Sequence, residues 1–186
     1  MISVLFTRVD SIYKTLGCDC WDIERDARNY NGDGPVICHP PCRSWSNMSH
    51  LSKPLAGEND LAIWSINLIR KNGGVLEHPK NSRLWKVMFL PKPGTTDCYG
   101  GFSLCVNQSW FGHLAEKKSL LYVCGINKNE VPPIPIRFDA IEYTVSSRIK
   151  KKSGRRTKRE LSKKQREQTP IDFAKWLIEL AEKCEK

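Results

Sequence analysis

The feature that most constrains the fold of this chain is a series of short apolar runs, each closed by glycine, proline or a polar residue. Runs this short and this apolar are typical of strands that are buried on both faces. We predict strands at the runs 3–7, 18–23, 35–38, 75–76, 102–106 and 119–126. Because helical segments separate several of them, the sequence predicts an α/β fold whose mainly parallel sheet is flanked by helices.

Two longer helices stand out between and after these runs. The stretch 58–72 carries an apolar stripe at helical spacing and is followed by Gly73-Gly74, which favours a helix end. Near the end of the chain, Thr169-Pro170-Ile171-Asp172 predicts a capping box with proline at the first helical position. We expect the helix after it to dock on the body through its apolar face, which is formed by Ala174, Leu177, Ile178 and Ala181.

Positive charge is concentrated in one segment. Residues 148–168 hold eleven basic and two acidic residues, and so carry nearly all of the net charge of +10. We divide the chain into an α/β body at 1–147, a basic arm at 148–168, expected to be a loop outside the core, and a C-terminal helix at 169–186. Clustered Lys and Arg release counterions from phosphate, which favours DNA or another nucleic acid as partner; a solvated solubility segment is the alternative. The arm residues expected to contact nucleic acid are Lys150, Lys151, Lys152, Arg155 and Arg156.

The composition does not indicate a membrane protein or a disulfide-stabilised one. Among 186 residues, no apolar run approaches the ~18 residues of a membrane span. We expect the apolar start, residues 2–6, to be a strand rather than a signal peptide, which predicts a cytoplasmic protein with eight free cysteines. The spacing of Cys18, Cys20, Cys38, His39 and Cys42 differs from standard zinc sites, so we expect no metal.

Two predicted strand ends carry residues that are able to do chemistry. Cys42 follows a strand across Pro40-Pro41, a stiff turn that would hold a thiol at the carboxyl edge of the sheet. We expect Arg43 beside it to lower the pKa of this thiol. Glu77 follows another strand and is fixed by Pro79, where a carboxyl group can hydrogen-bond a ring nitrogen. An inert packed cysteine and a salt-bridged surface glutamate are the alternatives.

The order of these elements resembles that of the DNA cytosine-5 methyltransferases, in particular the short methyltransferase-like proteins of phage. In that family a Pro-Cys loop carries the nucleophile, a Glu-Asn-Val or Glu-Asn-Pro element holds the cytosine, and a Gly-x-x-x-x-Arg-x-Arg element leads into a strand. Here the same order is formed by Pro40-Pro41-Cys42, by Glu77-His78-Pro79, and by Phe111-Gly112-His113 through Lys117-Lys118. The resemblance covers residues 1–126.

This resemblance implies an abbreviated Rossmann-like methyltransferase that uses S-adenosylmethionine to methylate C5 of cytosine in DNA. Cys42 would be the nucleophile and Glu77 the acid that holds the base. Arg43 and Lys117 or Lys118 would supply positive charge for the nucleic acid. A cytosine in a duplex would be flipped out of the stack to reach Cys42.

The cofactor end of the chain departs from the family. The family has a Gly-rich turn after the first strand to admit S-adenosylmethionine, whereas residues 6–11 contain no glycine. Asp22 or Glu24, at the end of the second strand, would take the ribose hydroxyls. Eleven residues then separate Glu24 from Val36, so one strand–helix unit is missing. Two alternatives stay open: a methyltransferase-like protein that binds nucleic acid or a host protein without methyl transfer, and a nucleotide- or base-modifying enzyme with another donor.

Overall fold

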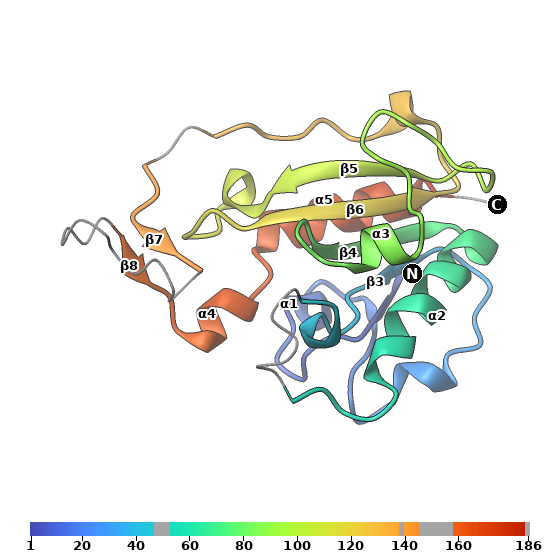
Figure 1. Cartoon of the computed structure of the whole chain (residues 1–186), viewed down its shortest axis with the longest axis horizontal. Coiled ribbons are helices and arrows are strands. Elements are labelled where there is room, and N and C mark those ends of the chain that lie inside the picture. Colours follow the sequence, from blue (N-terminus) through green and yellow to red (C-terminus); the bar gives the residue numbers. More distant parts are fainter. Residues whose placement is uncertain (47–52, 138–139, 146–157, 185–186) are drawn as a thin grey trace.

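The computed structural model describes residues 1–46, 53–137, 140–145 and 158–184. The chain is an α/β protein built on a six-stranded sheet (Figure 1). The strands of this sheet are β1 (Ser3–Leu5), β2 (Asp19–Trp21), β3 (Val36–Cys38), β4 (Gly74–Pro79), β5 (Phe102–Asn107) and β6 (Lys118–Cys124). Their order is β2-β1-β3-β4-β6-β5. The first four strands are parallel, whereas β6 runs antiparallel to both of its neighbours.

The helices are α1 (Ile12–Thr15), α2 (Glu58–Asn72), α3 (Leu84–Val87), α4 (Lys163–Glu167) and α5 (Ile171–Glu182). Short 3-10 turns cover Ala27–Asn29, Arg43–Trp45, Gln108–Phe111 and Lys128–Glu130. A separate parallel pair joins β7 (Tyr143–Thr144) to β8 (Arg159–Glu160). Figure 1 shows this pair and α4 side by side at one end of the molecule. Within the described ranges, no helix is long and apolar enough to cross a membrane.

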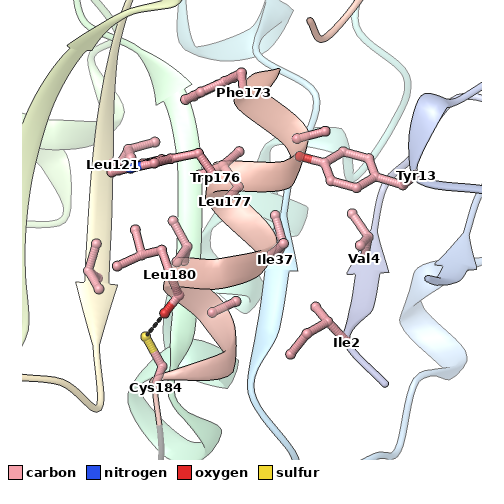
Figure 2. Packing of buried hydrophobic residues seen from close by; sticks show 14 of the residues in the cluster. Ile2, Val4, Tyr13, Ile37, Leu121, Phe173, Trp176, Leu177, Leu180 and Cys184 are labelled. Carbon is pink, nitrogen blue, oxygen red and sulfur yellow. Dashed lines mark hydrogen bonds between the residues drawn. The ribbon is translucent and has the colours of Figure 1, made fainter. Parts of the chain in front are cut away.

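Two helices cover opposite faces of the sheet. Because side chains alternate along a strand, Val4 and Ile37 belong to the core under α5, whereas Leu5 and Val36 belong to the core under α2. Figure 2 shows the first of these cores, with α5 side chains directed toward the strands and Tyr13 of α1 beyond them. The side chains that α5 contributes are Phe173, Ala174, Trp176, Leu177, Leu180, Ala181 and Cys184 at its end.

The α/β prediction with a mainly parallel sheet is confirmed, and α2 has the predicted bounds, but β6 adds an antiparallel strand that was not predicted. Strand β4 also extends further than predicted. It pairs with β6 from Gly74 to Pro79, which places Glu77 opposite Leu121, inside the strand rather than after it. The long neighbouring strand continues the hydrogen-bonded ladder and holds Glu77 in extended backbone.

The strand order places a crevice between β1 and β3. The chain leaves β1 toward β2 on one side and returns to β3 on the other, and ligands bind outside the carboxyl ends of strands at such a point. The two loops that begin there contain Phe6 and Cys42. Phe6 has φ of +61°, a left-handed backbone that is unusual for a bulky side chain. The turn therefore has a backbone conformation that glycine adopts most easily, although it contains no glycine.

The C-terminal segment differs from the predicted loop. Residues 158–168 form β8 and α4, and Leu161 is buried with 2% exposure, because the segment packs against the body. The predicted capping box of α5 does not form, since Pro170 is the N-cap and has no side-chain hydrogen bond to offer. The arm residues 148–157 lie outside the described residues.

Candidate active site

A cavity of about 1040 Å³ lies at the carboxyl edge of the parallel strands. Its walls are the loop from β1 to α1, the Pro-Pro-Cys loop after β3, the end of β4, the loop from β5 to β6, and α4 with the start of α5. Segments from the whole length of the chain therefore meet here. Both residues predicted to be catalytic, Cys42 and Glu77, line this cavity.

Cys42 comes directly before the 3-10 turn Arg43–Trp45 and is exposed to the cavity. Partial burial of its sulfur, followed by the negative charge of Glu77, raises the pKa of this thiol. Arg43 does not lower it as predicted, because its guanidinium is turned toward α2 and pairs with Glu58 at 2.8 Å. Cys42 is therefore a protonated thiol at neutral pH, and its activation requires a base.

Glu77 is held by three donors. Its Oε2 accepts from His39 Nδ1 at 3.2 Å, and its Oε1 accepts from Gln108 Nε2 at 3.1 Å and from the Ser119 hydroxyl. Burial alone would raise the pKa of this carboxyl, but the hydrogen bond from His39 and the positive charge of Lys117 outweigh it and lower the pKa to about 2. Glu77 is therefore an anion in a largely buried position, which makes it a suitable hydrogen-bond acceptor for a donor group of a ligand.

A further pair of residues extends this network. His39 Nε2 lies 3.0 Å from the hydroxyl of Tyr13, whose ring is buried against the same core as α5. Burial, and then the negative charge of Glu77, raises the pKa of Tyr13 well above its usual value, so the hydroxyl keeps its hydrogen. Three elements, α1, the loop after β3 and β4, thus share one chain of hydrogen bonds.

The structure distinguishes between the two candidate lysines. Lys117 lines the cavity, and its charge lowers the pKa of both Glu77 and the Cys42 thiol. Lys118 begins β6 and pairs with Glu116 at 2.8 Å. Because neighbouring residues of a strand point to opposite sides, Lys117 is the lysine that supplies positive charge at this site.

Charged residues tie α4 to the loop after β1. Arg8 contacts Asp10 at 2.8 Å and Glu167 of α4 at 2.7 Å. Lys164, also on α4, lies 3.6 Å from Asp10. All three contacts are at least partly exposed. The predicted basic arm therefore contributes, through α4, a wall of the cavity beside the first turn of the sheet.

The acids predicted to hold a cofactor lie elsewhere. Asp22 pairs with Lys14 at 2.6 Å through Oδ2, while Oδ1 accepts from the backbone of Glu24 and Arg25. Neither Asp22 nor Glu24 is among the described residues that line the cavity. In the same described part of the chain, no group of three or more His, Cys, Asp or Glu side chains is placed to hold a metal ion. All eight cysteines are free.

The nucleic-acid contacts predicted for the arm are not described by the structure. Lys150, Lys151, Lys152, Arg155 and Arg156 all lie in the range 146–157, outside the described residues. Arg43 is half exposed and remains accessible beside Cys42, although it also pairs with Glu58. The described end of the arm places Lys163 and Arg166 at the cavity.

Four residues of the network were not predicted from the sequence: Tyr13, His39, Gln108 and Ser119. His39 carries a usable signal, because it comes directly before Pro40-Pro41 and shares the stiff turn that holds Cys42. Nothing in the local sequence marks the other three, whose contacts depend on how α1 and the β5–β6 hairpin pack.

The chain was compared with protein-family models and with curated proteins. No family model matches it, and no curated protein matches it.

Proposed function

We propose that this protein modifies a pyrimidine base of a nucleic acid, most simply by methyl transfer to C5 of cytosine in DNA. The observation that carries the proposal is the meeting of Cys42 and Glu77 in one cavity at the carboxyl edge of the sheet. Covalent activation of a pyrimidine needs a nucleophile for C6 and a group that exchanges a proton with N3. A thiol and an ionised carboxylate are suited to these two tasks.

The activation step balances with Cys42 and Glu77 alone. The S–H bond breaks and an S–C6 bond forms, the C5=C6 electron pair becomes a C4=C5 bond, and the C4=N3 electron pair moves to N3. The thiol proton goes to N3, which becomes basic as it receives this electron pair, and Glu77 holds the new N3–H by accepting a hydrogen bond from it. The product is an enamine with a nucleophilic C5. Lys117 favours the thiolate as the proton leaves, since its positive charge lowers the pKa of the thiol.

The strand order supports a Rossmann-like sheet of the abbreviated kind that the resemblance implies. The order β2-β1-β3-β4 corresponds to part of the doubly wound order 3-2-1-4-5-6, with the outer strand of the first half missing. The short connection between Glu24 and Val36 contains one 3-10 turn, Ala27–Asn29, where that strand–helix unit would stand.

S-adenosylmethionine is the methyl donor that the resemblance implies, but the acids expected to hold its ribose do not fit that role. Both oxygens of Asp22 are engaged, and Glu24 lies outside the cavity lining. The activation proposed above therefore ends with a nucleophilic C5. It does not depend on which group donor then reacts with C5. Isothermal titration with S-adenosylmethionine separates the alternatives: micromolar binding supports methyl transfer, and no binding at high concentration supports another donor.

Nucleic acid as the partner rests on charge. Each phosphate contact contributes about −0.9 to the slope of log affinity against log salt concentration. If five or six cations of the arm contact phosphate, this slope is therefore near −5. Replacing Lys150, Lys151, Lys152, Arg155 and Arg156 by Gln flattens this slope. Equal affinity and slope in the substituted protein would show that the arm only aids solubility.

Covalent trapping tests the proposed reaction. DNA containing 5-fluorocytosine is incubated with the protein and S-adenosylmethionine, and the adduct is detected by its mass. We expect an adduct that is lost in Cys42→Ala and retained in Cys98→Ala, because Cys98 is the other exposed cysteine. No adduct with any DNA or nucleotide contradicts the proposal. It then favours the binding protein without catalysis, for which the glycine-free turn after β1 is the supporting observation.

A further inference from the structure

The lone pairs of Glu77 show which part of this carboxylate is open to a ligand. Two donors, Gln108 and Ser119, both use Oε1, whereas Oε2 has one donor, His39. A carboxylate offers about four lone-pair positions, two on each oxygen. Oε2 therefore keeps the one position that these three donors leave open, and His39 decides where that position points.

His39 is itself oriented from its other side. An ionised carboxylate only accepts hydrogen bonds, so the contact with Glu77 requires a hydrogen on Nδ1 of His39. In the neutral ring, Nε2 is then bare and accepts from the hydroxyl of Tyr13 at 3.0 Å. Tyr13 is fixed in turn, because its side chain is buried in the core beneath α5.

We propose that Tyr13 and His39 are positioning residues for Glu77: Tyr13 holds His39 as the Nδ1–H tautomer, and His39 directs the open lone pair of Glu77 Oε2 into the cavity. All three side chains line the cavity, so the chain of hydrogen bonds ends where a ligand binds. An anionic oxygen with one open position selects a ligand that presents a hydrogen-bond donor in the ring plane, such as an amino group or a protonated ring nitrogen.

This inference rests on the proposed function for its role in the reaction. As N3 takes up the proton, the hydrogen bond from His39 keeps Glu77 an anion that accepts from the N3–H, because that hydrogen bond is stronger to the anion than to the acid. The other titratable or charged groups that act on Glu77 are Lys117, from the loop before β6, and Cys42 itself. His39 and Tyr13 transfer no proton in this scheme.

The first test needs no substrate. The ring nitrogens of His39 are observed by nuclear magnetic resonance in protein labelled with nitrogen-15 histidine, and are assigned by their loss in His39→Asn. From the two hydrogen bonds of the ring, we expect hydrogen on Nδ1 and a bare Nε2, and a changed Nε2 signal in Tyr13→Phe. Tyr30→Phe, in which the ring lies against Trp21 outside the cavity lining, is the matched control. A hydrogen on Nε2 of His39 overturns the proposal, whether or not Nδ1 also carries one, because Nε2 then cannot accept from Tyr13.

The second test measures the rate of 5-fluorocytosine trapping in the same variants. We expect Tyr13→Phe to slow trapping about fivefold, the usual effect of one neutral hydrogen bond. His39→Leu should slow it at least about tenfold, since it removes a hydrogen bond to a charged group, and His39→Asn should restore part of the rate by donating to Glu77. Unchanged rates in Tyr13→Phe and His39→Leu overturn the proposal. If the wild type itself traps no DNA while His39 has the expected tautomer, the proposed function fails and the positioning stands.

Discussion

The buried side chain of His78 makes this protein less stable as the pH falls below neutral. His78 follows Glu77 in β4 but points to the opposite face of the sheet. There its ring packs edge-on against the ring of Trp85, with 6.3 Å between the two ring centroids. The side chain is fully buried, and no described residue gives either ring nitrogen a hydrogen bond of ordinary geometry. Burial lowers the pKa of His78 to about 4, against smaller opposite effects of Glu77 and the backbone of Pro41.

The size of the effect follows from the difference between folded and unfolded states. The unfolded chain binds the His78 proton with a pKa of 6.5, and the folded chain with a pKa of about 4. Between these two pH values the unfolded state binds more protons than the folded state. The free energy of unfolding therefore has its full value above pH 6.5 and decreases as the pH falls to 4. The loss amounts to about 3 kcal/mol, a large part of the 5–15 kcal/mol that is typical of a folded domain.

Chemical denaturation at pH 7 and pH 4 of the wild type and His78→Leu measures this contribution. We expect the wild type to lose about 3 kcal/mol more than the variant between the two values, or roughly 6–12 °C in Tm for a chain of this size. Groups shared by both proteins, such as His113 and Glu77, cancel in the comparison. Equal losses in the two proteins would refute the argument, because His78 would then not be a buried neutral group.

Three further outcomes follow from the structure. In a Cys98→Ala background, Glu77→Gln should lower the pKa of the Cys42 thiol and Lys117→Gln should raise it. The pKa is measured from the rate of iodoacetamide labelling as a function of pH. The same pKa in both variants and the parent would contradict the assigned effects of the two charges. Gly74→Ala should destabilise the protein by about 3 kcal/mol or more in urea unfolding, because a Cβ would overlap the backbone of Val36, whereas Gly94→Ala, also at positive φ but in open space, should cost about 1–2 kcal/mol. Glu167→Gln should leave Tm nearly unchanged, since its pair with Arg8 is exposed, and yet speed labelling of Cys42 by a bulky maleimide as α4 loosens; equal rates in both proteins would show that α4 does not limit access.

The sequence predicted those parts of the fold that are determined locally. Helix α2 begins and ends where its apolar stripe and Gly73-Gly74 indicate, because these signals lie in the helix and directly after it. The direction of β6 was not predicted, since an apolar run reads the same in a parallel and in an antiparallel strand. Its pairing with β4 was needed to place Glu77 inside that strand.

In the candidate site too, the residues marked by local sequence were predicted and those placed by tertiary packing were not. Cys42 and Glu77 were found because a stiff turn and a strand mark them locally, and the structure brings both to one cavity. The prediction that Arg43 lowers the pKa of Cys42 was wrong, because sequence adjacency does not reveal that Glu58, at the start of α2, takes its guanidinium. Tyr13 and His39 meet only because α1 packs against the sheet, a contact between residues 26 positions apart.

Hydrogen exchange at C5 of cytosine tests the central claim most directly, because it needs only the addition of Cys42 to C6 and no methyl donor. DNA carrying tritium at C5 is incubated with the protein, and tritium released to water is counted. We expect release by the wild type and by Cys98→Ala, a strong reduction in Glu77→Gln, and none in Cys42→Ala. Release at the same rate from Cys42→Ala, or no release from single- or double-stranded DNA with the wild type, would contradict the assignment of Cys42 and Glu77 to pyrimidine chemistry.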